Sequence, residues 1–277
     1  HNLVIPNKST DGEWITEIGA SIEAVGLFAG EGYYYDSVKL PERLEKIGQK
    51  AFLGSKIRKV TFPETLKEIG NMAFKDNELV EVVLTDSVEI LGSAAFMENV
   101  MLNKIVLSKS LKEIPASAFS NTTKSAPYNE LIIPDGVTEI GRGAFTGHSL
   151  KKLEIPTSVT KISSQAFANG EGQETLEELI LHEGLKTIDS MCFKCSDLKA
   201  VKLPATVTKL DKKTFFASAN KVIVYVDSMD QYTKFSAQKN DGHEVRINPG
   251  PWAIEDFTYE GTVVTGFSEK GLLKRAD

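Results

Sequence analysis

The chain has 277 residues, of which 41% are hydrophobic and 25% charged, as in ordinary folded proteins. Its net charge of −6 argues against nucleic acid and anionic lipid as partners, because both need a clustered basic surface. No run of 18 apolar residues occurs, so no membrane-spanning helix is expected. Only two cysteines are present, which excludes a framework of disulfide bonds.

The most informative feature is an internal repeat. One block ends in a phenylalanine that follows a small residue, with spacings of 22, 22, 23, 26, 22, 26 and 22 residues between the phenylalanines. These residues are Phe52, Phe74, Phe96, Phe119, Phe145, Phe167, Phe193 and Phe215. A second block of the form L-x-x-L-x-L lies between successive copies, for example at residues 79–84 and 198–203. Repeats of this length are typical of leucine-rich repeat proteins.

The two blocks predict one short strand and one return segment per coil. In L-x-x-L-x-L, the apolar residues at the fourth and sixth positions point to the same side of a strand. A single coil cannot bury this apolar side, whereas stacked coils form a parallel sheet over a continuous core. The predicted fold is α/β leaning β: a right-handed leucine-rich repeat solenoid with a parallel sheet and mostly irregular or short-helical return segments.

The coils differ along the chain. An irregular first coil is predicted at 1–36, in which Leu3-Val4-Ile5-Pro6 forms the strand and residues 15–19 form the return segment. Regular coils follow at 37–226, and a terminal cap at 227–248 closes a solenoid domain of 1–248. The cap is expected to contain a helix within 229–238 and a last strand at Val245–Ile247, because an open sheet edge needs covering.

The blocks resemble the BspA-like leucine-rich repeat family, whose pattern L-x-x-I-x-I-P-x-x-V-x-x-I-G-x-x-A-F recurs over residues 38–226. Departures include Ile114-Pro115 in place of Ile-Gly. The resemblance implies a bacterial protein that is secreted or displayed at the cell surface, with a role in binding or adhesion. Residues 249–277 resemble the lead-in to a further repeat array. Because such a lead-in would run into His1-Asn2-Leu3-Val4-Ile5-Pro6, the chain is expected to be part of a longer repetitive protein.

The groups that could carry chemistry do not form a recognisable site. Cys192 and Cys195 have C-x-x-C spacing, but Cys192 occupies the small position before Phe193, which favours a structural cysteine. The four histidines have neither metal-ligand nor catalytic-triad spacing, and no phosphate-binding or dinucleotide motif occurs. We therefore expect neither an enzyme nor a cofactor.

Two columns of side chains are expected on the outer side of the strands. The third position alternates in charge through Lys59, Glu81, Lys104, Glu130, Lys152 and Glu178. This alternation favours a self-neutralising ladder, with a polar recognition strip as the alternative. The fifth position includes the apolar residues Val83, Val106, Ile132 and Ile180. These indicate either strand propensity or a contact stripe for a ligand.

The two 26-residue spacings place longer loops at 120–128 and 168–175, on the same edge of the solenoid. Asn121, Tyr128 and Glu171 in these loops are further candidates for a binding surface, although loops of this kind also vary neutrally.

The sequence as a whole predicts a non-catalytic binding or adhesion module that contacts a host protein or another surface macromolecule. A structural spacer within a larger surface protein is the first alternative. The second alternative is a glycan-binding accessory region of a secreted enzyme.

Overall fold

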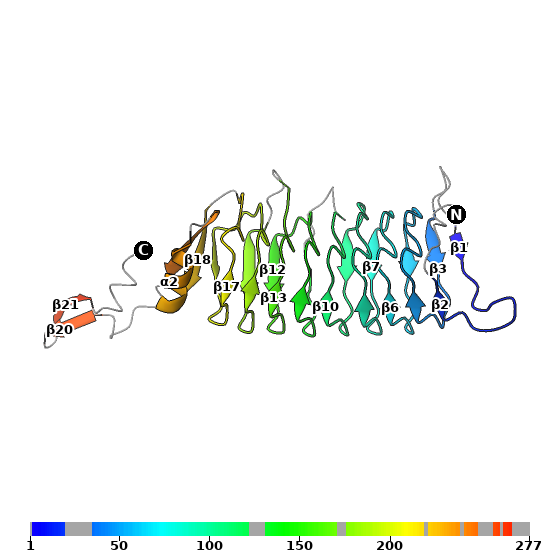
Figure 1. Cartoon of the computed structure of the whole chain (residues 1–277), viewed down its shortest axis with the longest axis horizontal. Helices are drawn as coiled ribbons and strands as arrows, with labels where there is room; N and C mark the ends of the chain where they lie inside the picture. The colour runs from blue at the N-terminus through cyan, green and yellow to red at the C-terminus, as the bar shows by residue number, and fades with distance from the viewer. Residues whose placement is uncertain are drawn as a thin grey trace.

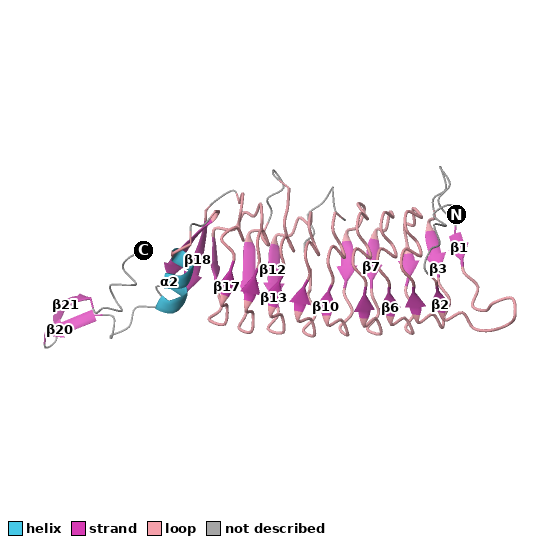
Figure 2. Ribbon diagram, viewed as in Figure 1, coloured by secondary structure: helices cyan, strands magenta, loops and turns pink. Residues whose placement is uncertain are grey.

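A computed structural model describes residues 2–19, 35–121, 131–170, 176–218, 221–238 and 241–248, together with the backbone of 257–260 and 263–267. The coils stack in one row along the long axis of the molecule, so that the first coil and the cap lie at opposite ends (Figure 1). Almost all regular structure is β, and one helix is described, near the C-terminal end of the row (Figure 2). The fold is a leucine-rich repeat solenoid built from parallel strands, as predicted.

The L-x-x-L-x-L blocks and the closing strand form one row of parallel strands, which pair in four groups (β1-β3-β5, β7-β9, β12-β14 and β16-β18-β19) and are together called the first sheet. Its strands are β1 (Asn2–Val4), β3 (Ser37–Lys39), β5 (Val60–Thr61), β7 (Glu81–Val83), β9 (Lys104–Val106), β12 (Lys152–Ile155), β14 (Glu178–Leu181), β16 (Ala200–Lys202), β18 (Val222–Val226) and β19 (His243–Ile247). Equivalent positions pair in register: Leu3 lies opposite Val38, and Val83 opposite Val106. The pairing of β1 with β3 confirms that Leu3-Val4-Ile5-Pro6 belongs to an earlier copy of the repeat.

The return segments contribute a second parallel sheet, which the sequence did not predict. Its strands have two residues each: β2 (Glu17–Ile18), β4 (Lys46–Ile47), β6 (Glu68–Ile69), β8 (Ile90–Leu91), β10 (Glu113–Ile114), β11 (Glu139–Ile140), β13 (Lys161–Ile162), β15 (Thr187–Ile188) and β17 (Lys209–Leu210). After most of these strands, the backbone N–H of the next residue donates to the preceding coil, as Gly70 N does to Ile47 O at 2.8 Å. Pro115 has no amide hydrogen, and the second sheet is interrupted there, between β8 and β10.

The core between the sheets is organised around the phenylalanine column. Successive rings from Phe52 to Phe215 stack with centroids 5.0 to 5.8 Å apart and interplanar angles of 2° to 19°. The preceding position is small and buried in each coil from Ala73 to Thr214, because the backbone of the neighbouring coil leaves little space there. The sequence therefore predicted the inward face of the return segments correctly.

Buried polar side chains satisfy the backbone beside this column. Asn77 accepts from Ile57 N at 2.9 Å and donates to Phe52 O at 2.7 Å. Asn99 stands at the same position of the next coil and donates to Phe74 O at 2.8 Å. Two coils later this position is His148, whose Nε2 lies 2.8 Å from Phe119 O. Burial lowers the pKa of His148 to about 4, so this imidazole is neutral in the folded protein at pH 7.

A helix and a strand follow the last coil. Helix α2 (Met229–Ser236) is capped at its N-terminus by Ser228, whose side chain accepts from Gln231 N at 3.2 Å. Gln231 Nε2 in turn donates to Pro204 O at 2.9 Å, which ties the helix to the preceding coils. The closing strand β19 pairs with β18. Beyond the cap in the sequence, β20 (Phe257–Glu260) and β21 (Val263–Phe267) pair antiparallel.

Candidate functional site

The outer side of the first sheet, here called the strand face, carries most of the predicted site residues. Val83 and Val106 are cross-strand neighbours on β7 and β9, with 41% and 42% of their surface exposed. Ile132, in the next coil, is 68% exposed and lies in a segment outside the regular strands. An apolar stripe of Val83, Val106 and Ile132 is therefore open to solvent. Ile180 differs, since it is half-buried and pairs with Glu154.

The charged column of the strand face pairs as the ladder hypothesis predicts. Glu81 lies between two cations, 3.9 Å from Lys59 Nζ and 3.8 Å from Lys104 Nζ. Lys152 Nζ lies 2.8 Å from Glu178, and this hydrogen bond raises the pKa of Lys152. Exposed pairs of this kind contribute little to stability individually, about 0–1 kcal/mol each. Their main effect is to leave the column without net charge over these coils.

The loop residues are less informative. Asn121 is exposed and has a left-handed backbone (φ 54°), and its backbone N–H donates to Thr146 O at 2.7 Å. Glu130, Tyr128 and Glu171 lie outside the described residues.

A hollow of about 520 Å³ opens on the strand face at the end of the apolar stripe. We call it the strand-face hollow, and its outer lining comprises Ile132, Asp135, Lys152, Glu154, Pro156 and His182. Two of these residues, Ile132 and Lys152, were predicted site residues, and the structure brings them together. His182 Nε2 lies 2.7 Å from Glu154 Oε1, which links neighbouring coils across the hollow.

Three residues of this lining were not predicted as site residues from the sequence: Asp135, Glu154 and His182. A signal for His182 does exist, because this residue stands directly after the L-x-x-L-x-L block, where Pro63, Pro134, Pro156 and Pro204 stand in other coils. Glu154 is the charged member of the otherwise apolar run between Ile132 and Ile180 in the fifth column. Neither departure from the repeat could be paired with the other before the coils were placed side by side.

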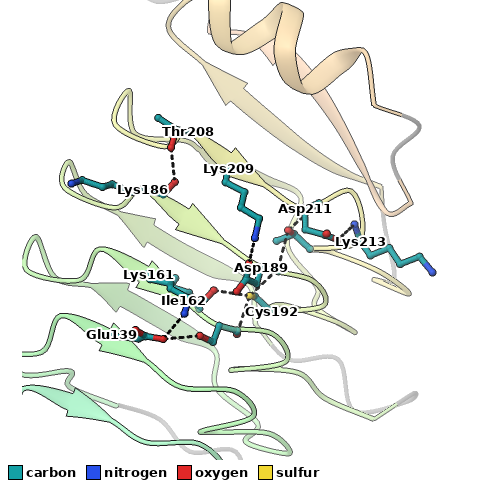
Figure 3. Close-up of polar contacts among 12 residues, drawn as sticks. Glu139, Lys161, Ile162, Lys186, Asp189, Cys192, Thr208, Lys209, Asp211 and Lys213 are labelled. Atoms are coloured by element: carbon teal, nitrogen blue, oxygen red, sulfur yellow. Dashed lines mark hydrogen bonds and ion pairs between the residues drawn. The ribbon is translucent and has the colours of Figure 1, made fainter.

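A second polar cluster lies on the second sheet (Figure 3). Lys161 Nζ lies 2.7 Å from Glu139, Lys209 Nζ lies 2.7 Å from Asp189, and these hydrogen bonds raise the pKa values of both lysines. Cys192 Sγ donates to Asp189 O at 2.9 Å, and burial raises the pKa of this thiol. The cations are held in ion pairs and the thiol stays protonated, so the cluster stabilises the stacking of coils.

Cys192 and Cys195 form no disulfide bond and are both buried, which agrees with the structural interpretation of this pair. Over the described residues, no three histidine, cysteine, aspartate or glutamate side chains meet as potential metal ligands. None of the described helices is long and apolar enough to cross a membrane.

The comparison with known families agrees with this geometry. The model of the BspA type leucine-rich repeat region, which comprises six copies, matches residues 25–126 and 123–239. The chain belongs to the BspA-type leucine-rich repeat family. No match was found among curated protein sequences.

Several solved structures align with most of this chain. A leucine-rich repeat protein from Bacteroides ovatus has 16% identity and a TM-score of 0.51, over 89% of this chain and 70% of that chain. The pneumococcal vaccine antigen PcpA has 20% identity and a TM-score of 0.45, over 89% of each chain. A leucine-rich cell surface protein from Faecalibacterium prausnitzii has 19% identity and a TM-score of 0.34, over 88% of this chain and 87% of that chain. At 16% identity, the likeness to the Bacteroides ovatus protein is one of fold.

Proposed function

We propose that this BspA-type chain is a non-catalytic binding module, secreted or displayed at a bacterial cell surface. It contacts a protein or another surface macromolecule through the strand face. The observation that carries the proposal is the apolar stripe of Val83, Val106 and Ile132, which runs into the strand-face hollow. Solvent-exposed apolar residues that are contiguous on one face favour an interaction site.

The contrast between the two columns of the strand face supports this assignment. The third column pairs its charges internally, as at Glu81 and Lys104, so it already has partners within the solenoid. The fifth column leaves aliphatic side chains open beside it. A partner that covers this stripe would remove apolar surface from water without breaking the ion pairs of the ladder. Family membership supports the extracellular location.

A structural spacer is the second candidate, and the ion-pair ladders favour it. Lys–Glu and Lys–Asp pairs join neighbouring coils on both sheets, as Lys152 and Glu178 do on the first and Lys46 and Glu68 on the second. Such a surface suits a rod that only separates other domains. A glycan-binding accessory region ranks third, because the described strand-face columns present no large aromatic ring apart from Tyr225 in the cap strand β18.

Binding measurements on the whole chain separate these candidates. The immobilised chain is tested against purified matrix proteins and glycans, and the proposed function predicts saturable binding of at least one protein. Val106→Asp and Ile132→Asp should each weaken that binding about tenfold or more, because a buried charge in an apolar contact is unfavourable.

Ile90→Asp is the matched control, since Ile90 is 56% exposed on the second sheet and should tolerate the same change without loss of binding. The absence of any saturable partner would favour the spacer. Binding that depends on Ile90 but not on Val106 or Ile132 would move the contact surface to the other sheet.

A further inference from the structure

We infer that the strand-face hollow binds a cationic side chain, an arginine or a lysine, presented by a partner protein. The aliphatic stem of that side chain would lie on Ile132 and Pro156. Its charged head would reach the carboxylates of Glu154 and Asp135. This inference rests on the proposed function, because it names the chemistry of the partner at the same face.

The size of the hollow suits a side chain together with part of its backbone. A volume of about 520 Å³ falls within the range of about 300–1,000 Å³ that is usual for ligand pockets. The hollow opens directly on the strand face, so a residue that projects from a protein surface can enter it without movement of the coils. It continues the apolar stripe at Ile132, which places the anchor next to the remaining contact area.

The lining of the hollow includes apolar residues. Ile132 is the most exposed aliphatic side chain of the stripe, at 68%, and Pro156 belongs to the same lining. Lysine and arginine bury their methylene stems on surfaces of this kind while the charged head stays at the water boundary. Of the described residues that line the hollow, none is phenylalanine, tyrosine or tryptophan, which removes the usual platform for a sugar ring.

The lining also contains two carboxylates, those of Glu154 and Asp135. Lys152, the one lysine among the described lining residues, already forms an ion pair with Glu178 at 2.8 Å. Glu154 shares a hydrogen bond with His182, and Asp135 forms no ion pair with any cation of the described residues. Asp135 and the second carboxylate oxygen of Glu154 therefore remain available to a cation. A carboxylate or phosphate ligand would be repelled here, whereas a guanidinium or ammonium group complements the charge.

The experiment titrates small probes into the whole isotopically labelled chain and follows amide shifts by NMR. The probes are N-acetylarginine amide, N-acetyllysine amide and N-acetylcitrulline amide, the last being the neutral analogue of arginine. Both cationic probes should bind saturably in the millimolar range and shift the amides of Ile132 and His182. The affinity for the citrulline probe should be lower by a factor of about five or more, because this probe lacks the charge.

Variants test whether the two carboxylates are responsible. Glu154→Gln and Asp135→Asn should each reduce affinity for the arginine probe about threefold, with unchanged thermal melts. Glu177→Gln is the matched control, since it removes the same charge from an exposed residue outside the lining that pairs with Lys151 at 3.7 Å. Equal binding of citrulline, or an equal loss in Glu177→Gln, would overturn the inference.

Failure of this inference can be told apart from failure of the proposed function. If the cationic probes do not bind but Val106→Asp still abolishes binding of a partner, the hollow has no cation site and the strand face remains the contact surface. If the probes bind at the hollow while no partner depends on the stripe, the cation site stands and the proposed contact surface is wrong.

Discussion

Replacing Phe145 by alanine tests the packing that holds the coils together. The side chain is fully buried, and its ring lies between Phe119 at 5.5 Å and Phe167 at 5.4 Å, measured between ring centroids. A third contact is the edge of His148 at 5.6 Å. The substitution therefore opens a cavity in the middle of the column, where both neighbouring coils lose a stacking partner.

The expected loss of unfolding free energy is about 3–5 kcal/mol, the usual range for a buried phenylalanine that is truncated to alanine. The upper part of this range is favoured, because stacked aromatic pairs contribute about 0.5–1.5 kcal/mol beyond their buried area and Phe145 takes part in two. The rigid neighbouring rings also limit how far the site can collapse. Lys152→Ala should lose less than about 1 kcal/mol, because its ion pair with Glu178 is exposed to solvent.

Urea denaturation followed by circular dichroism measures both variants against the parent chain. The comparison uses the shift in the midpoint together with the slope, because a change in slope would indicate that the array no longer unfolds as one unit. A smaller loss for Phe145→Ala than for Lys152→Ala would refute the assignment of the inner and outer sides of the coils.

Three further outcomes are expected. Burial lowers the pKa values of His148 and His243 to about 4, so the unfolded chain binds more protons than the folded chain below pH 6.5. The unfolding free energy should therefore fall by about 3 kcal/mol per histidine as the pH decreases from about 6.5 to about 4. Urea denaturation at each pH measures this loss. Gly141→Ala should destabilise the chain by at least about 1 kcal/mol, since the new Cβ would lie 2.7 Å from Ala116 N, whereas Gly19→Ala meets no atom within 4 Å and should be tolerated in the same melts. The thiol of Cys192, whose pKa is raised by burial, should resist a thiol reagent in the folded protein and react after unfolding in guanidinium.

Each of these outcomes can be contradicted directly. A flat stability profile between pH 4 and 6.5 in the presence of both histidines would mean that neither imidazole is held neutral by the fold. Equal melts for the two glycine variants would show that the coils at Gly141 can separate without cost. Rapid labelling of Cys192 in the folded chain would place it outside the core.

The structural features that the sequence by itself determined are those that the repeat specifies. Because coils stack in register, residues at equivalent positions become neighbours, and their partners can be read without coordinates. The phenylalanine column, the small residues before it, and the pairs of Glu81 with Lys59 and Lys104 were predictable for this reason. The cap was predictable as well, since the last strand needs cover and residues 229–238 could supply a helix.

Only the tertiary structure decided the features that join different columns or depend on backbone conformation. The second sheet has strands of two residues, too short to show a periodicity, and its return turns place non-glycine residues such as Lys50 and Met72 at positive φ. The strand-face hollow brings Glu154 against His182, which stand at different positions of their repeats. Glu154 lies opposite Ile180, so His182 is its diagonal neighbour two residues along, and the side-chain conformations bring the two groups to 2.7 Å. The spacing along a repeat contains no information about those conformations.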